Sequence, residues 1–140
     1  MSLAENEPIK ITGVITEEVG EPRNDKTPGS ALYVVPFRLS RTPSPEWVRA
    51  FLHTWELPPR FKSMHRPGIA TVSGDRIVLD GTTMEEVERY HFDTLKLAVA
   101  EANRIAGQER ARVKQRANGE LRKREEHRKK VEDIASRLRF

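Results

Sequence analysis

The chain has no cysteine among its 140 residues, no proline after Pro67 and no long apolar run. Without cysteine it cannot form disulfides, thiolate metal sites or cysteine nucleophiles. Its apolar runs are all shorter than the roughly 18 residues that a membrane-spanning helix needs, so we expect no membrane span. The first residues lack the basic and apolar segments of a secretion signal, and we expect a cytoplasmic protein.

The charge of the chain changes sign near Asn103. Residues 1–103 contain 12 Lys or Arg and 15 Asp or Glu, a net charge of −3, whereas residues 104–140 contain 13 and 6, a net charge of +7. Eight of the nine aromatic residues and all nine prolines lie in the first part. We therefore predict a compact head domain at residues 1–103 and a basic helical arm at residues 104–140.

The head carries two strand pairs, each followed by a helix. Residues 9–16 alternate apolar and polar side chains over most of their length, as half-buried strands do. Residues 31–40 predict a second strand, with Tyr33, Val35, Phe37 and Leu39 on one face, and Pro36 suggests an edge position or a bulge. Residues 69–72 and 76–79 flank a turn and predict a hairpin. Ser44 and Thr83 are typical helix caps, so we expect one helix after each strand pair.

This order predicts an α+β fold made of two ββα units. They would form a four-stranded antiparallel sheet with two helices on one face, plus a long basic C-terminal helical arm. The second helix has an inward apolar stripe that reaches Ala106. For the residues after Ala106 the sequence allows two structures: one continuous helix, or a helical hairpin that bends at Asn118 and Gly119.

The end of the arm carries a narrow apolar stripe at the spacing i, i+3, i+4, i+7. Its members are Val131, Ile134, Ala135 and Leu138. Tyr90 and Leu97 form a smaller patch on another side of the long helix. We expect the stripe to pack on this patch, on a protein partner or on a second copy of the chain. A long coiled coil is disfavoured because arginines occupy its seam positions.

Two basic triplets in the arm provide an alternative function. They consist of Arg122, Lys123 and Arg124, followed by Arg128, Lys129 and Lys130. Such clusters neutralise phosphates and give salt-sensitive nucleic-acid binding. However, acids stand four residues before several arm cations, in the order that favours helical ion pairs. Glu125 stands before Lys129 in this way, and Asp133 stands before Arg137. The arm also offers no aromatic residue for base stacking before Phe140.

A third hypothesis places a ligand site or an enzyme site in the loop at residues 62–66. Ser63, His65 and Arg66 bring together a hydroxyl, an imidazole and a cation, which in principle can bind an anion or act as nucleophile and base. No nucleophile-elbow motif, phosphate-binding loop or metal-ligand spacing of histidines accompanies them. We therefore predict no catalytic residue, no metal and no cofactor.

These observations lead to one main functional expectation. The chain is a small cytoplasmic binding or assembly module, not an enzyme, whose C-terminal helix docks on a protein partner or on a second copy. The alternative is an accessory nucleic-acid-binding protein that uses the basic arm on phosphates. The third hypothesis is the small-molecule or enzyme site around residues 62–66.

Overall fold

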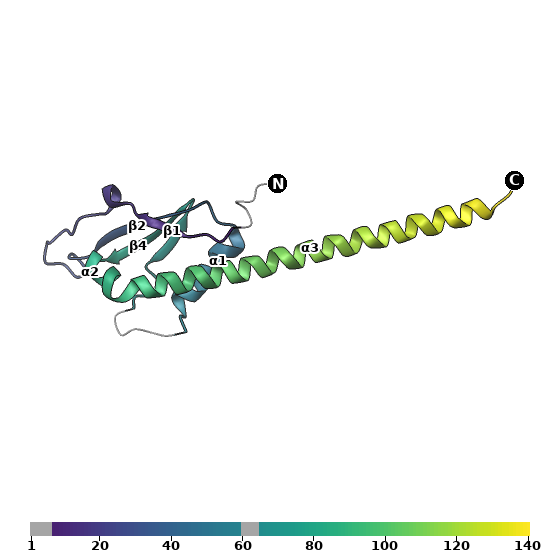
Figure 1. The fold of residues 1–140 in the computed structure, drawn as a ribbon. Helices are drawn as coiled ribbons and strands as arrows, with labels where there is room; N and C mark the ends of the chain where they lie inside the picture. Colours follow the sequence, from purple (N-terminus) through teal and green to yellow (C-terminus); the bar gives the residue numbers. More distant parts are fainter. Residues whose placement is uncertain (1–6, 60–64) are drawn as a thin grey trace. The chain divides into compact units, whose positions relative to one another are not determined.

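A computed structural model describes residues 7–59 and 65–140 of the chain. Four strands form one antiparallel sheet in the order β1-β2-β4-β3 (Figure 1). The elements in chain order are β1 (Ile11–Val14), η2 (Thr16–Glu18), β2 (Tyr33–Leu39), α1 (Pro45–Glu56), β3 (Ala70–Ser73), β4 (Arg76–Thr82), α2 (Met84–Glu86), the π-helical turn η3 (Val87–His91) and α3 (Phe92–Arg137). The predicted α+β class with a four-stranded antiparallel sheet and a long C-terminal helix is confirmed.

The chain forms two compact units, residues 1–106 and residues 107–140. The sheet, α1 and the first turns of α3 belong to the first unit. Helix α3 contains 46 residues and passes through Asn118 and Gly119 without a break. Of the two alternatives for this segment, the continuous helix is therefore the one observed. Within residues 7–59 and 65–140, no helix combines the length and the apolar character that a bilayer crossing requires.

Both helices of the first unit begin at the predicted caps. The Ser44 hydroxyl oxygen accepts a hydrogen bond from the Trp47 amide at 3.2 Å, and Pro45 occupies the first helical position. The Thr83 hydroxyl oxygen accepts one from the Glu86 amide at 3.1 Å. Each cap satisfies one of the amides that a helix leaves unpaired in its first turn.

One face of the sheet supplies the floor of the hydrophobic core. Alternate residues of the two central strands are buried there, namely Val35, Phe37 and Leu39 on β2 and Ile77 and Leu79 on β4. The register pairs Val35 with Leu79 and Phe37 with Ile77, so these side chains share one face.

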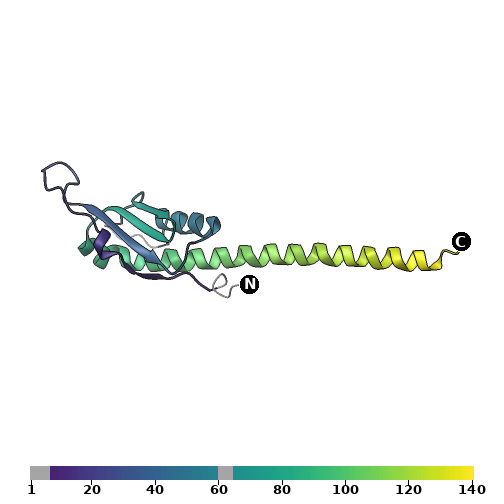
Figure 2. The same ribbon diagram turned by 90° about the horizontal axis from the view of Figure 1, so that it is seen from above.

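The helices supply the other layer of the same core. Trp47, Phe51 and Trp55 of α1 and Leu95 and Ala98 of α3 pack in one cluster with the buried sheet residues. The rings of Trp47 and Phe51 stack with their centroids 5.4 Å apart. The result is a two-layer arrangement, which Figure 2 shows from a second direction.

Pro36 does not lie on an edge strand or at a bulge. It sits within β2, between β1 and β4, and faces Val78 in the register. Its carbonyl accepts a hydrogen bond from the Ile15 amide at 3.0 Å, so its backbone polar groups point towards the side of β1. The missing amide of Pro36 is tolerated there because the short strand β1 has already ended at Val14.

A bulge in β1 changes the direction of its last side chain. Ile11 pairs with Leu39, whereas Gly13 pairs with Arg38 and Val14 pairs with Phe37, so the register shifts by one residue between Ile11 and Gly13. One extra residue in a strand reverses the alternation beyond it. Ile11 and Val14 therefore both point to the face that carries the core.

The side chain of Asn103 connects α3 to α1 and to the segment just before β1. Its carbonyl oxygen accepts hydrogen bonds from the Ile9 amide and from the Trp47 indole, both at 2.9 Å. Its amide nitrogen donates to the Ile9 carbonyl, also at 2.9 Å. Ile9 and Trp47 are buried, so water cannot replace these bonds easily.

We predict that Asn103→Ala destabilises the protein by about 2–4 kcal/mol, because it leaves the Ile9 amide, the Ile9 carbonyl and the Trp47 indole without their hydrogen bonds. Urea unfolding followed by tryptophan fluorescence measures this change. Asn118→Ala, an exposed asparagine of the same helix, is the matched control and should be neutral or slightly stabilising. An equal effect of the two substitutions would contradict the role of Asn103.

Candidate functional site

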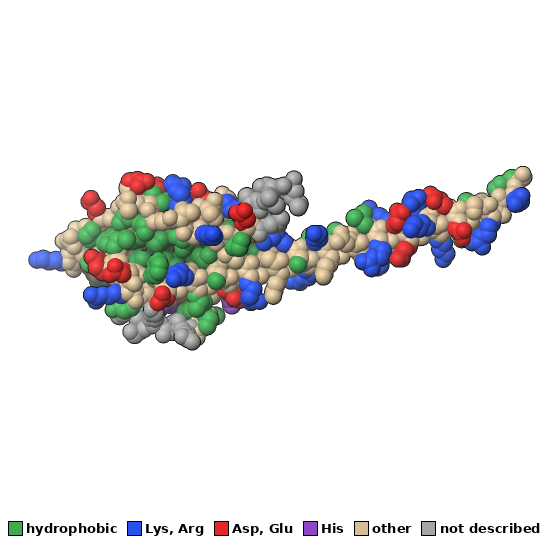
Figure 3. Space-filling view, in the orientation of Figure 1, with side chains coloured by type: hydrophobic (Ala, Val, Ile, Leu, Met, Phe, Trp, Pro, Cys, Tyr) green, Lys and Arg blue, Asp and Glu red, His purple; other side chains and the backbone are tan. Residues whose placement is uncertain are grey.

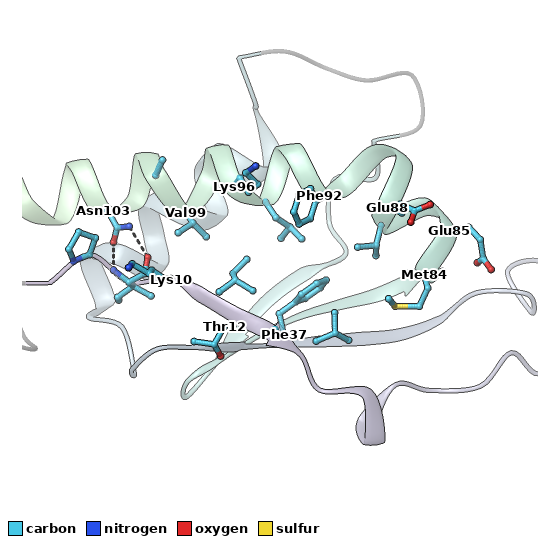
Figure 4. A pocket seen from close by; sticks show the side chains of 18 residues that line it. Lys10, Thr12, Phe37, Met84, Glu85, Glu88, Phe92, Lys96, Val99 and Asn103 are labelled. Atoms are coloured by element: carbon cyan, nitrogen blue, oxygen red, sulfur yellow. Dashed lines mark hydrogen bonds between the residues drawn. The ribbon is translucent and has the colours of Figure 1, made fainter.

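An open apolar groove lies beside the edge strand β1. It has a volume of about 1030 Å³ and runs between β1 and the helical segment formed by α2, η3 and α3 (Figure 4). In the space-filling view, apolar side chains gather over this part of the first unit (Figure 3). All residues that line the groove belong to the first unit.

The floor of the groove comes from the sheet and its walls come from the strand and the helix. Phe37 and the bulge-directed Ile11 and Val14 supply the floor. Leu95 and Val99 line the helical wall. Helix α1 contacts β3, the edge strand opposite β1, so it does not cover this part of the sheet.

Large apolar side chains on the helical wall remain exposed to solvent. Phe92 is 53% exposed and Met84 is 37% exposed. The ammonium group of Lys96 lies 5.0 Å from the centre of the Phe92 ring, within the range of a cation–π contact. An exposed apolar surface with a charged rim is typical of a site that another molecule covers.

The charges on the rim are separated along the groove. Glu85 and Glu88 lie at the end where the helical segment begins, whereas Lys10 lies near Asn103 at the other end and Lys96 lies between them (Figure 4). The hydrogen bonds between Asn103 and Ile9 close this second end. A helical occupant can therefore distinguish the two ends by charge.

A second cluster of polar groups surrounds the carboxylate of Glu86. The Arg66 guanidinium donates two hydrogen bonds to it, at 2.9 and 2.8 Å, and the Thr82 hydroxyl donates a third at 2.9 Å. These hydrogen bonds, above all those from Arg66, hold the pKa of Glu86 below its usual range. The carboxylate of Glu86 thus binds Arg66 and Thr82. It does not accept a hydrogen bond from the amide of the cap residue Thr83, as the acidic residue of a full capping box would.

His91 is buried next to this carboxylate. Its side chain is 0% exposed, and its Nε2 lies 3.9 Å from a carboxylate oxygen of Glu86. Neither ring nitrogen has a hydrogen-bond partner among residues 7–59 and 65–140. Burial lowers the pKa of His91, while the charge of Glu86 acts in the opposite direction. His91 is therefore kept neutral mainly by desolvation.

His65 and Arg66 of the predicted ligand loop also join this cluster. His65 Nε2 lies 2.7 Å from the Trp55 carbonyl, and its ring lies 6.2 Å from the ring of His91. Two of the five N–H donors of Arg66 are used by Glu86, which neutralises its charge and leaves the guanidinium less able to attract an anion. Ser63 lies outside the described residues. In the described part of the chain, no group of three or more side chains is placed to hold a metal ion.

The structure exposes the predicted apolar stripe, but α3 ends at Arg137, so Leu138 lies just after the helix and not on it. Val131 is 51% exposed, Ile134 is 45% exposed and Leu138 is 56% exposed. Of the patch proposed to receive it, Leu97 is exposed and Tyr90 is half-buried, but neither lines the groove.

The basic triplets are exposed, and only one of their six cations forms ion pairs with described residues. Arg128 contacts both Glu125 and Glu132. Glu125 thus binds the residue three positions on, and not Lys129 as the spacing predicted. The predicted pair between Asp133 and Arg137 is present, at 2.6 Å.

The groove is the feature that sequence reasoning missed. Alternation along β1 places Val14 on the face opposite Ile11, and only the bulge brings both residues into the groove. A glycine inside a strand pattern is a known bulge signal, so Gly13 was the available indication. The position of α3 relative to β1 has no comparable local signal.

Comparison with known proteins adds no assignment: no protein family, no curated protein and no solved structure matches this chain significantly.

We predict that His91 makes folding stability depend on pH. Its folded-state pKa lies below 6.5, so the unfolded chain takes up a proton first and stability falls as pH drops below about 6.5. One proton contributes at most about 1.4 kcal/mol per pH unit. His91→Leu should flatten the loss of stability between about pH 7 and pH 5, measured by urea unfolding.

Other charged groups face His91, so a control is needed. Glu86, His65 and Arg66 remain unchanged in His91→Leu, and any slope that they cause persists. His127→Leu removes an exposed histidine of α3 and should leave the slope as in the wild type. An identical pH slope for His91→Leu and the wild type would contradict the prediction.

Proposed function

We propose that the protein is a non-enzymatic assembly module whose C-terminal helix docks on a second copy of the chain. The docking side chains are Val131, Ile134 and Leu138, and flanking cations orient them. The cytoplasm is the proposed location. The single observation that supports this proposal most directly is the exposure of these three large apolar side chains at the charged carboxyl end of the chain, two on α3 and Leu138 directly after it.

Charge favours a second copy as the binding partner. Residues 1–103 carry a net charge of −3 and residues 104–140 carry +7, so the arm of one molecule is attracted to the head of another. The same chain also presents an apolar groove in its first unit and an apolar stripe in its second. Association between copies covers both surfaces without any additional protein.

The proposed contact is small, so we expect weak and reversible association. Two helical turns with three large apolar residues belong to the lower end of protein interfaces, well under about 1,200 Å². Such interfaces form at micromolar concentrations or above.

We predict that Ile134→Asp combined with Leu138→Asp abolishes self-association, because each aspartate would have to be buried without a counter-charge. Light scattering coupled to gel filtration, at about 10 to 300 µM, measures the mass against the 16.1 kDa chain. The matched control is Gln115→Asp with Ser136→Asp, which makes the same charge change at exposed positions outside the stripe.

The wild type and the control should both exceed the monomer mass at the upper concentrations, and the stripe variant should remain monomeric. A wild type that stays monomeric throughout would refute self-association. A stripe variant that assembles as well as the control would show that another surface drives it.

Nucleic-acid binding is the second candidate function, and the free cations of the arm favour it. Five exposed cations of the triplets have no acidic partner among the described residues. They are Arg122, Lys123, Arg124, Lys129 and Lys130. Cations that no acid neutralises remain available for phosphates.

If these five cations contact phosphates, affinity for double-stranded DNA should fall by roughly 10² to 10³ between about 50 and 200 mM salt. Fluorescence anisotropy with a labelled duplex measures this dependence. Replacing all five by glutamine should abolish binding, whereas Arg110→Gln, Lys114→Gln and Arg116→Gln on the same helix should retain most of it. Absence of binding by the wild type at low salt would remove this candidate.

A further inference from the structure

We infer that the groove between β1 and α3 is the receiving surface for the terminal stripe of a second copy. The inference rests on the proposed function and names the site at which the docking helix is bound. It joins an apolar groove and an apolar stripe that the described residues leave exposed.

The spacing of the stripe matches the way in which helices occupy grooves. Val131, Ile134, Ala135 and Leu138 recur at i, i+3, i+4 and i+7, the anchor pattern of an amphipathic helix in a hydrophobic groove. The groove offers an apolar floor at Ile11, Val14 and Phe37, with Leu95 and Val99 on its wall. Val131, Ile134 and Ala135 lie on α3, and Leu138 directly follows its last residue, Arg137.

The length of the groove also suits this occupant. Its helical wall extends from Met84 to Asn103, about 28 Å at 1.5 Å per residue. The stripe from Val131 to Leu138 spans only about 11 Å by the same measure. The additional length of the groove accommodates the charged residues on either side of the stripe.

Cations flank the stripe on both sides. Lys129 and Lys130 directly precede Val131, and Arg137 and Arg139 lie beside Leu138. Glu85 and Glu88 mark the end of the groove where the helical segment begins, and Lys96 and Lys10 lie farther along it. The two acids can therefore pair with cations of the docked segment, whichever of its ends lies beside them.

Pairing of two arms with each other is the competing arrangement, and the sequence of α3 disfavours it. A seam that extends the stripe towards Leu121 places Arg124 and Arg128 against the same residues of the other arm. Like charges in a helical seam are costly. Docking of the last two turns in the groove leaves both arginines in solvent.

Disulfide trapping between separately purified variants tests the inference directly, because the chain has no cysteine of its own. Ala135→Cys places a thiol in the stripe, and Ala100→Cys places one on the exposed helical wall of the groove. Thr71→Cys, an exposed residue of the opposite edge strand β3, is the control. Mixing the Ala135→Cys chain with each of the others under mild oxidation permits only bonds between copies.

We expect the mixed dimer of Ala135→Cys with Ala100→Cys to exceed that with Thr71→Cys at least tenfold on a non-reducing gel. A predominant dimer of Ala135→Cys with itself, together with no excess at Ala100, would show pairing of arms and overturn the inference. Equal trapping at Ala100 and Thr71 would overturn it as well.

A blocking substitution separates this inference from the proposed function. Ala100→Arg fills the exposed wall of the groove, and Ala111→Arg makes the same change on α3 outside both the groove and the stripe. Ala100→Arg should weaken self-association at least tenfold while the circular dichroism spectrum stays unchanged. If the stripe variant loses assembly but Ala100→Arg does not, the groove is not the receiving surface, although the proposed function stands. If the wild type does not assemble, the proposed function itself is refuted.

Discussion

The contact between the Asn103 side chain and the backbone of Ile9 is the constraint on which the rest of the first unit depends. One amide group pairs with both polar backbone groups of Ile9 and also accepts from the Trp47 indole. The segment just before β1 is thereby hydrogen-bonded to α3. Farther along, no comparable contact is drawn between strand and helix, and the groove opens between them (Figure 4).

A second polar centre fixes the beginning of the long helical segment. Glu86 stands in its first turn, where a negative charge interacts favourably with the helix dipole. Its carboxylate joins Arg66 and Thr82, and the buried His91 follows one π-helical turn later. Because Arg66 comes from the segment between α1 and β3, this centre links the chain before β3 to the chain after β4. The ring of Trp55 lies 5.5 Å from that of His91 and separates the polar centre from the apolar core.

Local signals in the sequence were sufficient for most of the elements and insufficient for the site. The caps at Ser44 and Thr83 and the strand alternation depend on neighbouring residues, so they were predictable. The register shift beside Gly13 and the interior place of Pro36 depend on which strands pair. The groove depends on the distance between β1 and α3, which Asn103 sets from more than ninety residues away. The exposed stripe was predictable because it follows from the spacing of apolar residues within one segment and not from the packing of distant segments.

In the assembly that we propose, a C-terminal helix that is ordered before it docks allows a small apolar stripe to suffice. Ion pairs along α3, such as those of Arg128 with Glu125 and Glu132 and of Arg137 with Asp133, favour the helical state of this exposed segment. A helix that is already formed loses little conformational entropy when it docks. In this proposal, three half-exposed apolar side chains contribute to binding without first having to order the segment that carries them. The same ion pairs neutralise part of the basic charge, so that apolar burial, more than charge, would decide where the helix binds.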